Sequence, residues 1–140
     1  MIANRLQLTF ANHADEAPHV ARKIEAFLHT QQVDLRVINK ILLCVDELVT
    51  NIIGHAYTDQ AEHAVSLECS IQEDRIMLEL RDDGVPFNPT INSHGPKLFK
   101  TIEDTQIGGL GVHLVMTLMD HVEYQREGDF NVLRATKMIA

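Results

Sequence analysis

The sequence contains no tryptophan and no uninterrupted apolar stretch long enough to cross a membrane. Its first ten residues, MIANRLQLTF, have neither a charged start nor a continuous apolar core, so we expect no signal peptide and a cytoplasmic protein. Basic residues are also scarce: 12 Lys and Arg against 20 Asp and Glu give a formal net charge of -8. This charge argues against nucleic acid and anionic membranes as partners, because both are bound through basic surfaces.

Cysteine is limited to Cys44 and Cys69, which lie far apart in apolar segments and form no C-x-x-C pair. We expect both to be buried free thiols. The eight histidines include no H-E-x-x-H motif or Cys/His cluster, so the sequence does not predict a structural zinc site. A Walker A loop and a dinucleotide fingerprint are missing as well.

The chain has 140 residues, 45% of them hydrophobic, which favours a single domain over residues 1–140. Alternating or helical periodicity predicts strands and helices in the order strand, two helices, hairpin, helix, hairpin. The expected segments are 5–10, 15–30, 34–56, 65–72, 76–81, 108–119, 122–126 and 130–139, with Asp15 and Asp34 as the N-caps of the first two helices. This order predicts an α+β fold: a two-layer α/β sandwich in which three helices cover one face of a mixed, mostly antiparallel sheet.

The long helix carries a polar stripe of Glu47, Asn51 and His55, each one helical turn from the next. The stripe lies roughly 130° from the centre of the apolar face, so its side chains can line a pocket at the flank of the core. A carboxylate and a carboxamide one turn apart suit a general base and a ligand for a hard metal ion. The same pattern is also common on solvated helix surfaces.

Two further stretches carry candidate chemistry. Residues 81–89, RDDGVPFNP, form an acidic turn after a strand, and either Asp82 or Asp83 can be its buried acid. A carboxylate there can accept a hydrogen bond from an exocyclic amine, and Gly84 allows close approach to a flat ring. Residues 108–115, GGLGVHLV, place glycines where a helix opens, and unpaired amides at that position suit phosphates. Turns that only serve the fold are the competing interpretation for both stretches.

Periodicity fails between these two stretches, over about residues 88–107. An unstructured connection of this length is usually functional or disordered, and we interpret it as a mobile lid over a ligand, with a plain surface loop as the alternative. Lys97 and Lys100 are its basic residues, and they are either contacts of a terminal phosphate or solvated lysines.

Taken in order, E-L-V-T-N-I-I-G-H-A-Y, D-D-G-V-P-F and G-G-L-G-V-H-L-V resemble the nucleotide-binding boxes of the GHKL ATPase superfamily. Pro86 stands where chaperone-like and histidine-kinase-like members carry glycine, which points to the anti-sigma-factor serine/threonine kinase branch. The resemblance implies a histidine-kinase-like ATPase fold that binds ATP and Mg²⁺. It implies Asp82, rather than Asp83, as the contact of the adenine amine, Asn51 as a Mg²⁺ ligand and Glu47 as the general base. The remaining nucleotide contacts that it implies are Gly84, Pro86, Phe87, Gly108, Gly109, Leu110, Gly111 and Val112.

The same resemblance implies a kinase that phosphorylates an anti-sigma antagonist protein of the STAS type and sequesters a partner such as a sigma factor. It also implies a homodimer. The segment 88–107 has no arginine, however, so efficient phosphoryl transfer is not assured by the sequence. Two alternatives stay open: a nucleotide-gated regulatory module with little or no kinase activity, and an α/β interaction domain that binds no nucleotide.

Overall fold

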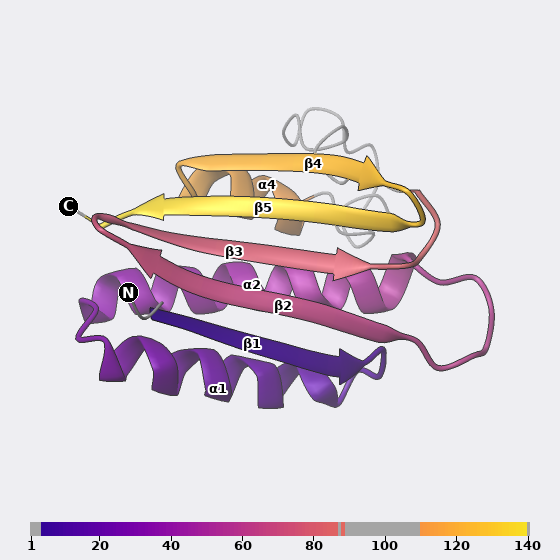
Figure 1. Cartoon of the computed structure of the whole chain (residues 1–140), viewed down its shortest axis with the longest axis horizontal. Helices are drawn as coiled ribbons and strands as arrows, with labels where there is room; N and C mark the ends of the chain where they lie inside the picture. The colour runs from indigo at the N-terminus through magenta and orange to yellow at the C-terminus, as the bar shows by residue number, and fades with distance from the viewer. Residues whose placement is uncertain (1–3, 87, 89–109, 140) are drawn as a thin grey trace.

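The computed structural model describes residues 4–86, 88 and 110–139. Within these ranges the protein is a two-layer α+β sandwich (Figure 1). The strands are β1 (Asn4–Ala11), β2 (Ala64–Gln72), β3 (Arg75–Asp82), β4 (His121–Glu127) and β5 (Phe130–Met138), and the helices are α1 (Glu16–Thr30), α2 (Leu35–His55) and α4 (Leu110–Leu118). The sequence-based order of elements is therefore confirmed, with boundaries that differ by one or two residues.

The five strands form one sheet in the order β1-β2-β3-β5-β4, and all four pairings are antiparallel. No parallel pair occurs in the described part of the sheet, whereas the sequence predicted a mixed, mostly antiparallel sheet. Two tight turns join neighbouring strands through backbones with positive φ, at Glu73 (53°) and Gly128 (61°). The order brings the end of β3 beside the start of β5, far away in sequence, in the register Asp82↔Asn131.

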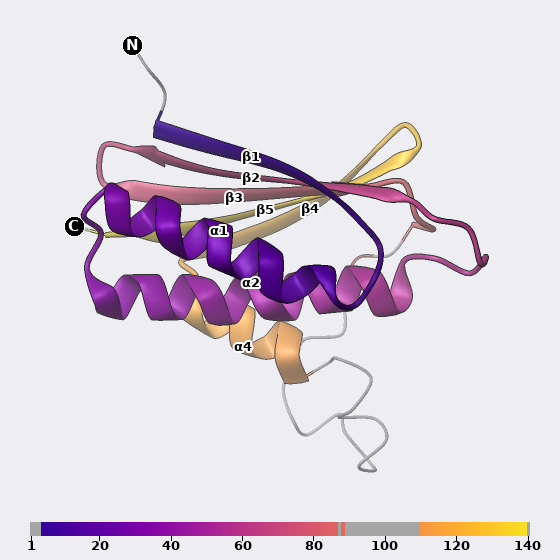
Figure 2. The ribbon, with the colours of Figure 1, turned by 90° about the horizontal axis from the view of Figure 1, so that it is seen from below.

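The three helices of the described residues lie on one face of the sheet (Figure 2). α1 and α2 form an antiparallel hairpin, and α4 lies along α2 on the side away from α1. Alternation along the strands turns one set of apolar side chains toward these helices, where they are almost completely buried. The central members of this core are Ile24, Leu28, Ile38, Ile41, Val45, Leu67, Ile76, Leu78, Leu80 and Val115.

Helix starts differ in how they are capped. Asp34 caps α2 as predicted, since its side chain accepts a hydrogen bond of 2.7 Å from the Arg36 backbone amide. Asp15 occupies the cap position of α1, but its side chain makes no capping hydrogen bond there. The predicted N-cap position of Asp15 is therefore confirmed, but the helix start gains no hydrogen bond from its side chain.

Cys44 and Cys69 are free and buried in this core, as predicted. Burial raises the pKa of the Cys44 thiol to about 11 and that of the Cys69 thiol to about 12. None of the described helices has the length and apolar character that a membrane span requires.

Candidate functional site

Asp82 lies at the end of β3, on the core-facing phase of the strand, and is only 4% exposed. One of its carboxylate oxygens, Oδ1, accepts hydrogen bonds of 2.9 Å from the Gly84 amide and from Nδ2 of Asn131. Asp83 is exposed, and its Oδ1 lies 3.3 Å from Nδ1 of His63. Of the two acids that the sequence left open, the structure therefore buries Asp82.

The turn after Asp82 packs against the end of α2. A Cβ on Gly84 would lie 2.3 Å from the backbone oxygen of Ala56, a distance that no real side chain accepts. The Val85 amide donates a hydrogen bond of 2.8 Å to that same oxygen. Glycine is required here because two backbones meet. The close approach predicted for Gly84 was to a flat ring of a ligand, and it stays a prediction. Pro86 follows at the surface.

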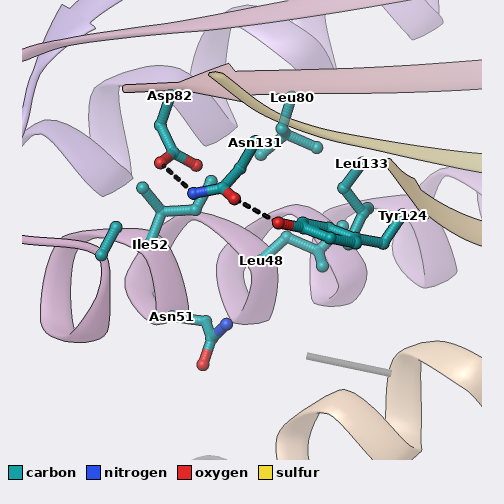
Figure 3. A pocket seen from close by; sticks show the side chains of 9 residues that line it. Leu48, Asn51, Ile52, Leu80, Asp82, Tyr124, Asn131 and Leu133 are labelled. Atoms are coloured by element: carbon teal, nitrogen blue, oxygen red, sulfur yellow. Dashed lines mark hydrogen bonds between the residues drawn. The ribbon is translucent and has the colours of Figure 1, made fainter. Parts of the chain in front are cut away.

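The hairpin of β4 and β5 supplies residues that the sequence reasoning missed. Asn131 is 5% exposed and bridges Asp82 to the Val85 backbone oxygen, while the Tyr124 hydroxyl and Arg126 donate to Oδ1 of Asn131. A pocket forms between this hairpin, the end of β3 and α2 (Figure 3). Its walls are Leu48, Asn51, Ile52, Ala56, Leu80, Asp82, Tyr124, Asn131 and Leu133. The pocket is thus mostly apolar, with a few convergent polar groups, as small-molecule sites usually are.

α2 brings its polar stripe to this region. Asn51 lines the pocket and is 9% exposed, and Figure 3 shows its side chain on the side of α2 turned away from Asp82 and Asn131. Glu47, one turn earlier, is partly buried, and its pKa is raised by desolvation and then by the neighbouring charge of Asp46. A carboxylate with a raised pKa is suited to accept a proton. His55 is exposed at the end of the helix.

The glycine-rich stretch is described only from its third residue. α4 begins at Leu110, so Gly111 and Val112 lie in its first turn, and Figure 2 shows α4 as a whole next to α2. The predicted contacts Phe87, Gly108 and Gly109 lie outside the described residues. The lid at 88–107 also lies outside them except for Asn88, and with it Lys97 and Lys100. Among the residues described, no group of three His, Cys, Asp or Glu side chains is placed to hold a metal ion.

A second cluster borders the acidic turn. The rings of Tyr57 and His63 stack with their centroids 4.3 Å apart, and His63 contacts Asp59 at 2.9 Å and Asp83 at 3.3 Å. Its hydrogen bond to Asp59 is the main reason why the pKa of His63 is raised. Burial, followed by the charges of Asp82 and Asp83, raises the pKa of the Tyr57 phenol. The connector between α2 and β2 is thereby joined to the acidic turn.

The chain is similar to known proteins over most of its length. A family model described as "Histidine kinase-like ATPase domain" matches residues 10–137. The chain is 28% identical over 120 residues to the anti-sigma F factor of Oceanobacillus iheyensis, covering 86% of this chain and 82% of that protein. It is 32% identical over 96 residues to the serine/threonine-protein kinase BtrW of Bordetella bronchiseptica, covering 69% of this chain and 67% of that protein.

Solved structures share the fold. The crystal structure of the RsbU and RsbW domains of a Mycobacterium tuberculosis protein superposes with a TM-score of 0.65 at 13% identity, covering 96% of this chain and 32% of that one. The histidine kinase domain of an Erythrobacter litoralis blue-light activated kinase gives a TM-score of 0.58 at 19% identity, covering 90% of this chain and 60% of that one. The chain belongs to the histidine kinase-like ATPase domain family. Within it, anti-sigma factors and serine/threonine kinases are among its relatives.

Proposed function

We propose that this chain is an ATP-dependent serine/threonine protein kinase of the anti-sigma type. The observation that carries the proposal is the buried Asp82 carboxylate, which has one oxygen fixed by two donors at the wall of a mostly apolar pocket. In the described residues no hydrogen bond reaches its other oxygen, Oδ2. A carboxylate oxygen in an apolar pocket favours a ligand with a donor, such as the amino group of adenine.

The residues present fit Mg-ATP, in which Mg²⁺ neutralises charge and the terminal phosphate is the group transferred. Asp82 would hold the base, with Gly84 and Pro86 beside it. The side-chain oxygen of Asn51 would be one ligand of Mg²⁺, which usually keeps water and phosphate as its other ligands. The amides at the start of α4, with the glycines before it, would hold phosphates. Phe87, Lys97 and Lys100 are proposed contacts on the lid side.

Glu47 is proposed as the general base, whose carboxylate accepts the proton from a serine or threonine hydroxyl of the protein substrate. The proposed substrate is a STAS-type anti-sigma antagonist. A phosphate adds about −1.5 to −2 charge to that antagonist. Because this chain carries a net charge of -8, the added charge favours release of the product. We also propose that the chain sequesters a sigma factor as a second partner besides the antagonist. The proposal further includes a homodimer and a cytoplasmic location.

Phosphoryl transfer from labelled ATP to a panel of STAS-type antagonists tests the proposal. Glu47→Gln is expected to abolish transfer while ATP still binds, because the variant removes only the proton acceptor. Asp46→Asn is the matched control, since Asp46 is the exposed neighbour of Glu47, and it should keep both properties. ATP binding without transfer to any antagonist would instead favour a nucleotide-gated regulatory module. The absence of ATP binding would overturn both functions.

A further inference from the structure

Two buried polar residues face each other across the pairing of β3 and β5. Asp82 and Asn131 are register partners, and each lies on the core-facing phase of its strand, in line with apolar residues such as Leu80 and Leu133. A polar side chain in such a position needs hydrogen bonds to offset its burial. The pair is therefore held by the hydrogen bonds that it makes, and their directions decide what the pocket offers to a ligand.

The orientation of the Asn131 amide is fixed by its partners. Its Nδ2 donates to Oδ1 of Asp82 and to the backbone oxygen of Val85, both at 2.9 Å. Its Oδ1 accepts from the Tyr124 hydroxyl and from Nη1 of Arg126, the latter at 3.2 Å. A flipped amide would turn two hydrogens toward donors and its oxygen toward two acceptors, so the flip is disfavoured at all four contacts.

This arrangement uses both hydrogens of the Asn131 amide within the protein. Together with the Gly84 amide, it also occupies Oδ1 of Asp82, so the carboxylate is fixed with Oδ2 as its remaining acceptor. Arg126 adds a second tie to the same turn, because its Nη1 donates to the Gly84 backbone oxygen at 2.8 Å. The β4–β5 hairpin thus sets the position of the acidic turn on one side, and the contact with Ala56 at the end of α2 sets it on the other. Figure 3 shows the hydrogen bonds between Asp82, Asn131 and Tyr124.

We propose that Asn131 is a positioning residue that makes the pocket selective for a purine with an exocyclic amine over one with a carbonyl at the same place. The proposal rests on the proposed ATP-binding function. Because Oδ2 of Asp82 is already fixed, it can accept a hydrogen bond from an amine without the carboxylate losing rotational freedom on binding. A carbonyl there would face a carboxylate oxygen, and the amide of Asn131 cannot turn a hydrogen toward it. Selectivity therefore depends on the hairpin as well as on Asp82.

The test compares three ligands by calorimetry: Mg-ATP, Mg-GTP and the Mg complex of purine riboside triphosphate, which has hydrogen in place of the 6-amino group. A hydrogen bond to a charged group corresponds to about tenfold to a hundredfold in affinity, so the wild type should prefer ATP over purine riboside triphosphate by that factor. Asn131→Leu has a similar volume and cannot make the four hydrogen bonds. It is expected to lose most of this preference while its affinity for purine riboside triphosphate changes little. The preference of Asn131→Leu for ATP over GTP should also be smaller than that of the wild type.

Tyr124→Phe removes one of the two donors that fix the amide, so an intermediate loss of preference is expected. This variant keeps the test valid if Asn131→Leu does not fold. Gln125→Leu is the control on the same hairpin, because Gln125 is exposed and adjacent to Tyr124 on the other face of β4; it should keep the wild-type preference. An unchanged ATP preference in Asn131→Leu or Tyr124→Phe would overturn the positioning role. A wild-type chain that binds no ATP would instead overturn the proposed function.

Discussion

Replacing Gly84 by alanine should separate the acidic turn from α2. The added Cβ would lie 2.3 Å from the backbone oxygen of Ala56, 2.6 Å from its Cβ and 2.8 Å from its carbonyl carbon. Two of these neighbours are backbone atoms, so one of the two segments must move. Overpacking of this kind costs about 1–3 kcal/mol. Loss of the hydrogen bond from Val85 to Ala56 adds about 1 kcal/mol, so the free energy of unfolding should fall by about 2–4 kcal/mol.

Urea unfolding followed by circular dichroism measures this change, and Gly54→Ala is the control. Gly54 is exposed in α2, and a Cβ there would meet nothing within 4 Å. Alanine is favoured over glycine in helices by about 0.5–1 kcal/mol, so the control should be at least as stable as the wild type. Because the displaced turn carries Asp82, Gly84→Ala should also weaken ATP binding. A Gly84→Ala protein with wild-type stability would refute the idea that two backbones are in obligatory contact here.

Three further predictions concern other parts of the molecule. Asn51→Ala should reduce the dependence of nucleotide affinity on Mg²⁺, whereas Asn39→Ala, at an exposed position of the same helix, should not. Nucleotide titrations with and without EDTA measure this dependence. Equal dependence on Mg²⁺ in the two variants would contradict the prediction. The pKa of His63 is raised in the folded protein, so the stability difference between wild type and His63→Gln should be full below about pH 6.5, the unfolded value, and vanish as pH rises through the folded value. Equal differences at pH 6 and pH 9 would contradict this linkage. Cys44 and Cys69 should react with a thiol reagent only slowly in the native protein and rapidly in urea, because burial raises both pKa values, to about 11 and about 12; rapid native labelling at pH 8 would show that they are accessible.

The elements of the fold follow from local patterns. The strands alternate, the helices carry an apolar stripe, and Asp34 caps α2 by a hydrogen bond to a residue two positions away. Such signals lie within a few residues of each other, so the sequence contains them. The same pattern locates Asp15 as the N-cap residue of α1, but a residue type does not by itself determine the rotamer, and the Asp15 side chain makes no capping hydrogen bond. In a similar way, RDDG indicates a turn, but only the phase of β3 decides that Asp82 is buried and Asp83 exposed.

The hairpin side of the pocket depends on contacts between residues far apart in sequence. Asn131 meets Asp82 because β5 pairs with β3 in one particular register, and a shift by one residue would turn it to the opposite face. One signal was available: Asn131 shares the alternation phase of Leu133 and Ala135, both buried, and a polar residue on a core-facing phase needs an explanation. The partners of that residue, Tyr124 and Arg126, cannot be chosen without the pairing of β4 and β5.

Calorimetry of Asp82→Asn and Asp83→Asn with Mg-ATP tests whether a purine triphosphate binds with its exocyclic amine on Asp82. An asparagine oxygen at position 82 can still accept both hydrogen bonds that fix Oδ1, while its amide group would face the amine of the base with a donor instead of an acceptor. Asp82→Asn should therefore bind ATP at least about tenfold more weakly, by the cost of a lost hydrogen bond to a charged group. Asp83→Asn, at an exposed neighbouring position, should bind within about threefold of the wild type, as surface substitutions usually do. Equal affinities in the two variants, or wild-type affinity in Asp82→Asn, would show that Asp82 does not bind the base.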